Sequence, residues 1–184
     1  MASANKSISY IHLDTVDSTN SWAKKHVRPS NSLLCVTAEE QTGGRGQGSK
    51  SWVSPRGENL YASLCFAVPR DFPKINELNS MLARSLVAVL ETYGYSAQIK
   101  QPNDLLINQK KIAGILTEAI TYKDHIDLFL GIGINVNMTS EHLKQVDQPA
   151  TSLQLESKDQ QPLDRLKLLH ALTQHFARLL HQLG

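Results

Sequence analysis

An amphipathic stretch from Pro73 to Tyr93 sets the strongest limit on the architecture of this chain. Its apolar residues recur at spacings of three and four, which aligns them along one side of an α-helix: Leu78, Met81, Leu82, Leu86, Val89 and Leu90. Gly94 follows directly and is a common helix terminator. Residues 161–183 predict a second amphipathic helix, with Leu166, Leu169, Leu172, Phe176 and Leu179. Both helices need another layer on which to bury their apolar sides.

Segments typical of β-strands can form that layer. Five of them have β-branched or alternating apolar residues: residues 7–13, 33–37, 59–68, 95–100 and 127–137. Residues 105–107 and 111–120 predict a hairpin across Asn108-Gln109. A short helix over 21–27 follows a cluster of helix N-cap residues, Asp17-Ser18-Thr19-Asn20. We therefore predict a mixed α+β fold.

The composition is that of a soluble single domain. The chain has 184 residues, 41% of them hydrophobic, and a net charge of +2, which disfavours a strongly basic nucleic-acid binder. Cys35 and Cys65 lie in apolar runs without metal-ligand spacing, and we expect buried, reduced thiols. Neither a signal peptide nor a run of ~18 apolar residues is evident, so we expect a cytoplasmic protein without a membrane span.

The segment from Glu39 to Pro55 differs from its surroundings because it holds four glycines and almost no large apolar residue before Trp52. Glycines let backbone N–H groups approach and cradle an anion, and Arg45 and Lys50 add positive charge. The segment matches neither the P-loop nor the dinucleotide-binding pattern. From these residues alone, an anion-binding loop and an ordinary mobile, solvated loop both remain open.

Two further segments have residues suited to ligand binding. In residues 100–104, Asp104 could hold Mg²⁺ or a hydroxyl group, although a simple turn is an alternative. Lys111 could contact a carboxylate and a phosphate, or the Lys110-Lys111 pair could be a charged hairpin edge. Gly131 and Gly133 lie within a predicted strand, where glycine marks either close approach of a ligand or a bulge.

Taken together and in this order, the motifs resemble the catalytic domain of biotin protein ligases. The resemblance spans about Ile11 to Leu180 and rests on five motifs: Asp17-Ser18-Thr19-Asn20, the Gln-Thr-x-Gly-Arg-Gly loop from Gln41, the Lys-x-Pro-Asn-Asp turn, Lys-Ile-Ala-Gly-Ile-Leu from Lys111, and Gly-Ile-Gly-Ile-Asn from Gly131. It implies the catalytic fold shared with class II aminoacyl-tRNA synthetases, in which helices flank a mixed, largely antiparallel β-sheet.

The resemblance also implies an activity. Such an enzyme uses ATP and Mg²⁺ to activate biotin as biotinyl-5'-AMP, and then transfers biotin to a lysine of the biotin carboxyl carrier protein of acetyl-CoA carboxylase. Because the biotin carboxylate and ATP are both anions, catalysis needs positioned cations more than a general base. A glycine-rich loop that orders over the ligand would keep water from the adenylate.

The family's functional residues carry over position by position. The catalytic cations would be Lys111 and Arg45. Biotin would be bound by Ser18, Thr19, Asn20, Gln41, Gly44, Arg45, Gly46, Lys111, Gly114, Gly131 and Gly133. ATP or the adenylate would contact Gln47, Lys50, Trp52, Asn103, Asp104, Lys111, Ile134 and Asn135, with Asp104 as a candidate Mg²⁺ ligand.

The chain departs from the family at three of these motif positions. Many members have arginines near Gln47 and Lys50, and lysine lacks the bidentate fork of arginine. We therefore expect a weaker hold on the adenylate than in members with the fuller set. Tryptophan is common in the family at the position of Gln101, and no physical reason for this exchange is evident.

The resemblance further implies a single catalytic domain over residues 1–184, without an N-terminal helix-turn-helix domain and without the C-terminal β-barrel domain of many bacterial members. No DNA or membrane partner is expected, and a homodimer is possible. Two other interpretations are a lipoate or octanoate ligase or transferase of the same fold, and a non-catalytic biotin-binding module.

Overall fold

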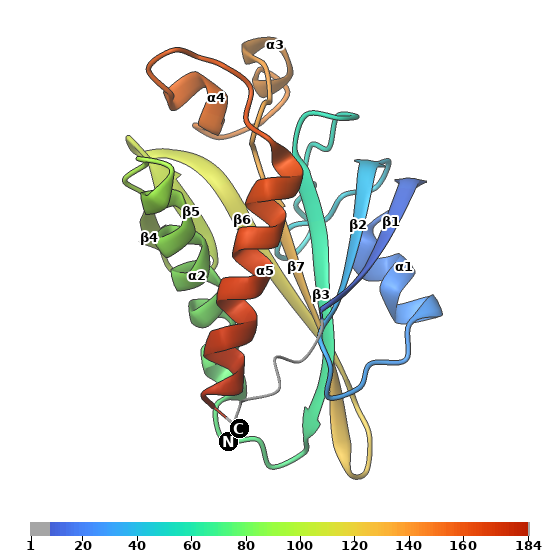
Figure 1. The fold of residues 1–184 in the computed structure, drawn as a ribbon. Helices are drawn as coiled ribbons and strands as arrows, with labels where there is room; N and C mark the ends of the chain where they lie inside the picture. Colours follow the sequence, from blue (N-terminus) through green and yellow to red (C-terminus); the bar gives the residue numbers. More distant parts are fainter. Residues whose placement is uncertain (1–7, 184) are drawn as a thin grey trace.

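The computed structural model describes residues 8–183, and its centre is a seven-stranded β-sheet (Figure 1). The strands are β1 (Ser9–Val16), β2 (Leu34–Gln41), β3 (Leu60–Pro69), β4 (Gln98–Lys100), β5 (Asp104–Ile107), β6 (Lys110–Thr121) and β7 (His125–Ile134). The helices are α1 (Thr19–His26), the 3₁₀ turn η1 (Ile75–Glu77), α2 (Leu78–Thr92), α3 (Ser140–Leu143), α4 (Leu153–Glu156) and α5 (Arg165–His181).

The sheet has the order β1-β2-β3-β7-β6-β5-β4. Only β1 and β2 pair in parallel, and the remaining neighbours are antiparallel. The mixed, largely antiparallel sheet implied by the resemblance is therefore confirmed. Its longest pairings join β7 to β3 and to β6, which places β7 in the middle of the sheet.

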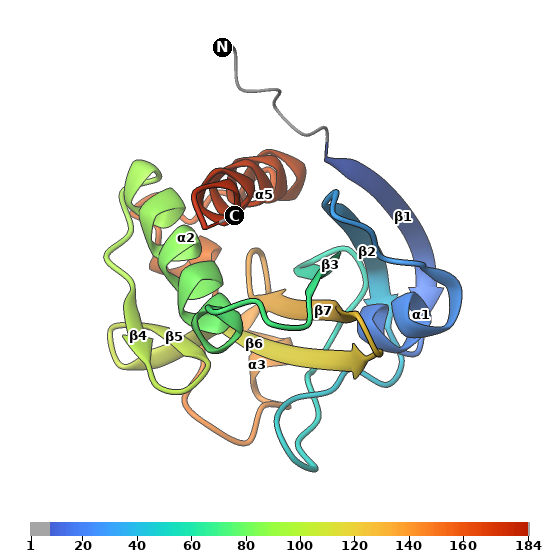
Figure 2. The same cartoon turned by 90° about the horizontal axis from the view of Figure 1, so that it is seen from below.

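The two faces of the sheet are covered differently, as Figure 2 shows from below. The amphipathic helices α2 and α5 pack side by side on one face and bury Leu82, Leu86, Leu172 and Phe176 in the main core. The short helix α1 lies against the other face and packs Ala23 and Val27 on Val36, Cys65 and Phe129. Much of that second face is left uncovered by helices.

Strand β7 shows how the sequence separates the faces. Its even positions, including Leu130, Ile132 and Ile134, belong to the main core under α2 and α5. Its odd positions face the other way and change from large to small along the strand, from Phe129 to Gly131 and Gly133. Because successive strand side chains point to opposite faces, this pattern opens space only on the α1 side.

Most predicted elements are present with shifted ends. The hairpin turn is confirmed: Asn108 and Gln109 both have positive φ, at 49° and 66°, as a tight two-residue turn requires. The strand predicted over 95–100 is shorter and covers Gln98–Lys100. Strand β2 continues to Gln41, so the first residues of the predicted glycine-rich loop belong to the sheet, where pairing with β1 extends it beyond the end of the β3 pairing at Ala38.

Cys35 and Cys65 are free and buried, as predicted. Burial raises the pKa of both thiols, that of Cys65 to about 12, so both stay protonated at neutral pH. Among residues 8–183, no helix has the length and apolar character needed to cross a membrane.

Two leucines of α5 should contribute differently to the free energy of unfolding, because only one of them packs in the core. Leu172 is fully buried, whereas Leu166 is 59% exposed. We predict that Leu172→Ala lowers the free energy of unfolding by about 2–5 kcal/mol, because it removes buried apolar contacts and leaves a cavity. Leu166→Ala is the control and should stay within about 0.5 kcal/mol of the parent. Urea unfolding measures both, and equal effects would contradict this packing.

Candidate active site

A cleft lies on the face of the sheet that α2 and α5 leave free. It is bounded by the N-terminal end of α1, by the glycine-rich loop and by the strands β6 and β7. Its lining comes from distant parts of the chain: Ser18, Thr19, Asn20, Gln41, Arg45, Gly46, Gln47, Lys50, Ser51, Trp52, Ala62, Asn103, Asp104, Lys111, Gly114, Ile115, Leu116, Gly131, Ile132, Gly133 and Gln148. Three lining residues are cationic and one is a carboxylate, so the cleft suits an anionic ligand.

The floor of the cleft is bare strand. A Cβ atom at Gly133 would lie 2.4 Å from the Trp52 indole, and one at Gly114 would lie 3.0 Å from it. A Cβ atom at Gly131 would meet the Asn20 side chain at 2.9 Å. These glycines are therefore required for Trp52 and Asn20 to reach the sheet, before any ligand is considered.

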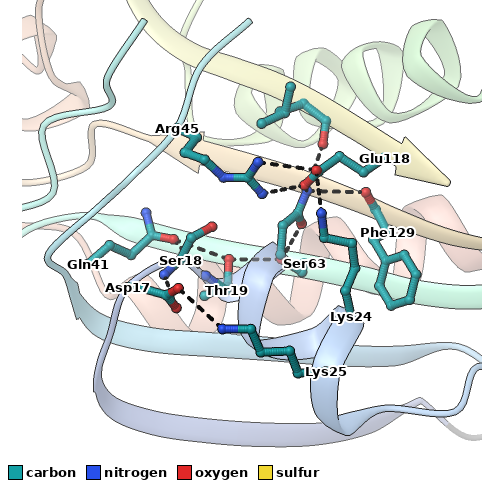
Figure 3. A network of polar contacts seen from close by, with 12 residues as sticks. Asp17, Ser18, Thr19, Lys24, Lys25, Gln41, Arg45, Ser63, Glu118 and Phe129 are labelled. Atoms are coloured by element: carbon teal, nitrogen blue, oxygen red, sulfur yellow. Dashed lines mark hydrogen bonds and ion pairs between the residues drawn. The ribbon is translucent and has the colours of Figure 1, made fainter. Parts of the chain in front are cut away.

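A chain of polar groups lines the α1 end of the cleft (Figure 3). The Gln41 Oε1 atom accepts a hydrogen bond of 2.9 Å from the Thr19 N–H at the start of α1, where Ser18 makes no side-chain cap. Ser63 Oγ lies 2.8 Å from Thr19 Oγ1 and 2.5 Å from Asn20 Oδ1. Ser63 is fully buried and Thr19 and Asn20 nearly so, so this end of the cleft has fixed polar groups.

The glycine-rich loop folds back on itself as a narrow ribbon. Trp52 N–H donates to the Gly44 carbonyl at 2.8 Å, and Gly46 N–H donates to the Lys50 carbonyl at 2.8 Å. Arg45 and Ser51 form an antiparallel bridge between these bonds. A Cβ atom at Gly44 would lie 2.4 Å from the Trp52 carbonyl oxygen, so only glycine permits this crossing. The prediction that the loop is mobile without ligand stays a prediction.

The Arg45 side chain leaves this ribbon and reaches the Glu118 carboxylate on β6 (Figure 3). Its two terminal nitrogens donate to the two carboxylate oxygens at 3.2 and 2.6 Å. Lys24 donates to the same carboxylate at 2.6 Å, and Asn20 donates at 3.0 Å. Burial alone would raise the pKa of Glu118, but the hydrogen bonds from Lys24, Arg45 and Asn20 outweigh it and hold the pKa below its usual range.

Lys111 is held by both its backbone and its side chain. Its N–H donates to the Pro149 carbonyl and its carbonyl accepts from Thr151 N–H, each at 2.9 Å. Its Nζ atom lies 2.7 Å from Asp104 Oδ1 and 5.3 Å from the centre of the Trp52 ring, a cation–π contact. The ammonium group is therefore positioned at the wall of the cleft with donors left for a ligand.

A second cavity adjoins the first across this wall. Both cavities are lined by Ser51, Trp52, Lys111 and Gln148, and the second one is completed by Val53, Asn135, Gln145, Val146, Asp147 and Ala150. Asn135 is buried and ties the end of β7 to the following segment, because its Nδ2 atom donates to the Thr151 carbonyl at 3.1 Å. Lys111 and Trp52 thus stand at the junction of two spaces.

The structure brings most of the sequence-predicted residues together. The first cavity is lined by Ser18, Thr19, Asn20, Gln41, Arg45, Gly46, Gln47, Lys50, Trp52, Asn103, Asp104, Lys111, Gly114, Gly131 and Gly133, and the second includes Asn135. Two do not line either cavity. Gly44 is packed against the backbone of Trp52 and the side chain of Ser54, and the side chain of Ile134 is buried in the core on the opposite face of the sheet.

Sequence reasoning missed Glu118, Lys24 and Ser63. A signal for Glu118 existed, because it follows Gly114 and Leu116 at alternating positions of one strand, and alternate residues share a face. For Lys24 and Ser63 no such local signal exists, because Lys24 reaches Glu118 only when α1 packs on the sheet, and Ser63 of β3 joins the site only through Thr19 and Asn20 of that helix.

Comparisons with known proteins agree with this arrangement. Residues 12–135 match the model of the biotin/lipoate A/B protein ligase family. The chain is 36% identical over 149 residues to the bifunctional ligase/repressor BirA of Bacillus spizizenii, a match that covers 78% of this chain and 45% of that protein. It thus spans less than half the length of this relative. It is 30% identical to a biotin–[acetyl-CoA-carboxylase] ligase of Paracoccus denitrificans, over 93% of this chain and 72% of that one.

Among solved structures, the chain is similar to the biotin protein ligase of Aquifex aeolicus in complex with biotin and ATP. The TM-score is 0.77 at 30% identity, over 95% of this chain and 71% of that one. The family match covers more than half of the chain, and the sheet order and the cleft are consistent with it. This chain is a member of the biotin/lipoate A/B protein ligase family.

Proposed function

We propose that this protein is an ATP-dependent ligase that activates biotin as biotinyl-5'-AMP and transfers it to a lysine of a biotin carboxyl carrier domain, that of acetyl-CoA carboxylase. The observation that carries the proposal is the junction of two cavities at Lys111 and Trp52, with a cation held at the boundary. A reaction that joins two anionic substrates needs adjacent binding sites with a positive charge where they meet. The names of the relatives support the same activity.

In the first half-reaction, the biotin carboxylate attacks the α-phosphate of ATP and pyrophosphate leaves. The carboxylate is ionised at neutral pH, so no base is needed. The main barrier is the approach of two anions and the charge that builds on the phosphorus oxygens. Lys111 and Arg45 both line the cleft, so they supply the positive charge that would lower this barrier.

Mg²⁺ would supply further neutralisation of the phosphates when bound. Among residues 8–183, no cluster of three or more metal-ligating side chains occurs. Mg²⁺ bound to a nucleotide, however, commonly takes only one or two protein carboxylates beside phosphate oxygens and water. Asp104 is the carboxylate that lines the cleft, so it would be the protein ligand, and its Oδ1 atom would be shared with Lys111 Nζ, which lies 2.7 Å away.

The second half-reaction needs the adenylate to survive until the carrier arrives. The amine of the carrier lysine attacks the activated carbonyl, an amide bond forms, and AMP leaves. Water competes for the same carbonyl. Residues of the ribbon from Arg45 to Trp52 line the cleft, and the Trp52 indole lies on its floor, so the ribbon would exclude water if it closed on a bound ligand.

The polar end of the cleft favours biotin over lipoate within the family. Thr19, Asn20 and Gln41 present fixed hydrogen-bonding groups there. The ureido ring of biotin offers matching N–H and C=O groups, whereas the dithiolane ring of lipoate offers none. Thr19, Asn20 and Gln41 already have hydrogen-bond partners within the protein, so the preference would come from the bonds that biotin gains there and lipoate cannot form.

We predict that biotin raises the melting temperature of the protein measurably and that lipoic acid at the same concentration does not. Ligand that binds only the folded state stabilises it in proportion to RT ln(1 + [L]/Kd). Thermal-shift measurements with both acids check this. An equal or larger shift with lipoic acid would favour a lipoate or octanoate enzyme instead.

Two neighbouring lysines offer a matched test of catalysis. We predict that Lys111→Ala lowers biotin-dependent exchange of labelled pyrophosphate into ATP by at least about 10²-fold, because it removes a positioned charge from the site. Lys110→Ala removes an exposed charge one residue away and should leave exchange near that of the parent. Biotin incorporation into a purified carrier domain should follow the same order.

Full activity of the Lys111→Ala variant would contradict the catalytic assignment. Absence of exchange in the parent protein, together with biotin binding, would favour a non-catalytic biotin-binding module. The expected cytoplasmic location, the single catalytic domain, the possible homodimer and the lack of DNA binding stay predictions.

A further inference from the structure

We propose that Glu118 is a positioning residue of this site: it holds Arg45, and with it the glycine-rich loop, over the cleft in the geometry that the adenylation step needs. The proposal rests on the proposed function and extends it to a residue on β6 that the motif assignments do not include. Glu118 does not line either cavity, so its effect would pass through Arg45.

The first support is the geometry of the pair. Arg45 donates to both oxygens of Glu118, at 3.2 and 2.6 Å, which is the bidentate arrangement that fixes the orientation of a guanidinium group. The Glu118 side chain is 20% exposed and the Arg45 side chain 40%, so the carboxylate end of the pair is the part sheltered from water, and the support lies in the two-bond geometry more than in burial. A single flexible contact would not define the arginine position in this way.

The second support is that Glu118 is itself immobile. Asn20 Nδ2 lies 3.0 Å from Glu118 Oε2, 3.1 Å from the Leu116 carbonyl and 3.4 Å from the Phe129 carbonyl, which ties the carboxylate to β6 and β7. Lys24 Nζ from α1 lies 2.6 Å from Oε1. The carboxylate is thus anchored by the sheet and by α1, and Arg45 is the partner that belongs to the loop.

The third support concerns the loop. The ribbon of residues 44–52 is closed by its own backbone bonds, which set its shape but not its position over the sheet. Within residues 8–183, the Arg45–Glu118 pair is the only ion pair that joins residues 43–51 to the sheet. Further attachments lie at the base of the ribbon: Gly43 N–H donates to the Asp17 carbonyl at 2.8 Å, and Trp52 contacts Gly114 and Gly133.

Lys24 allows Arg45 to turn from Glu118 towards a substrate during the reaction. When an anionic substrate draws the Arg45 guanidinium towards itself, Glu118 retains Lys24 as a counter-ion, so its charge is never left buried and unpaired. The arginine can therefore share its donors between Glu118 and a ligand at low cost. Because Arg45 lines the cleft and Glu118 does not, replacing Glu118 would leave the positive charge of the cleft in place.

If Glu118 anchors Arg45, its removal should change the rate of the reaction and not the binding of ATP. In a Glu118→Gln variant the cleft keeps Arg45 and loses one negative charge nearby, so the KM for ATP should not rise by more than about twofold. The arginine loses its bidentate anchor, and kcat for pyrophosphate exchange should fall about tenfold, the scale expected when the transition state lacks one charge-assisted hydrogen bond. A variant that was only less well folded would not reproduce this pattern in a cycle with Arg45.

The decisive experiment is a double-mutant cycle of Glu118→Gln and Arg45→Ala, measured by biotin-dependent pyrophosphate exchange. If Glu118 acts through Arg45, Glu118→Gln should lower kcat in the parent and have no further effect in the Arg45→Ala background. Glu58→Gln is the matched control, because Glu58 is 19% exposed and ion-paired with His142 at 2.6 Å. It should leave exchange unchanged. Additive losses in the cycle would overturn the proposal.

A second measurement needs no activity. Trypsin can cleave after Arg45, and cleavage of the ligand-free protein there should be at least about threefold faster in Glu118→Gln, because cleavage follows the population of the released loop. Glu58→Gln should match the parent, and unchanged cleavage in Glu118→Gln would count against the anchor. A parent without exchange would refute the proposed function, whereas a parent with exchange and a fully active Glu118→Gln would refute only this inference.

Discussion

Trp52 contacts the sheet only because β7 and β6 have no side chains beneath it. A Cβ atom at Gly133 would lie 2.4 Å from the indole, and the same indole lies over Gly114 on the neighbouring strand, which pairs with Gly133. This contact fixes the base of the glycine-rich ribbon. The ribbon in turn places Arg45 within reach of Glu118, and the indole separates the two cavities. The position of the ribbon and the division of the cleft into two cavities therefore both depend on strand residues without side chains, Gly114 and Gly133.

The charges of the site follow a second regularity. Each of the two cations assigned to catalysis is paired with a carboxylate on a strand, Lys111 with Asp104 and Arg45 with Glu118. Pairing lowers the cost of burying a cation and fixes its direction, although it also weakens its attraction for a ligand. For a reaction between two anions, fixed direction is the more useful property, because charge must be in place where it develops.

Predictions from the sequence succeeded where the signal is local. The periodicity of residues 78–90 predicts α2, and Gly131 and Gly133 lie within the predicted strand, where Asn20 and Trp52 approach the backbone closely. Local signals were less accurate at element ends. Strand β2 runs on to Gln41 because β1 pairs with it there, and β4 is short because it is an edge strand with only β5 beside it.

For the site, the motif residues identify the kinds of groups that are present: glycines at the floor, cations in the loop and on β6, and polar groups before α1. Tertiary structure decides which of them meet. Arg45 and Glu118 are 73 residues apart, and Asn20 bonds groups 96 and 109 residues away. Such contacts depend on strand order and on the packing of α1, and neither follows from local spacing. The residue types could be read along the chain, but the pairing of charges that positions them exists only in the folded sheet.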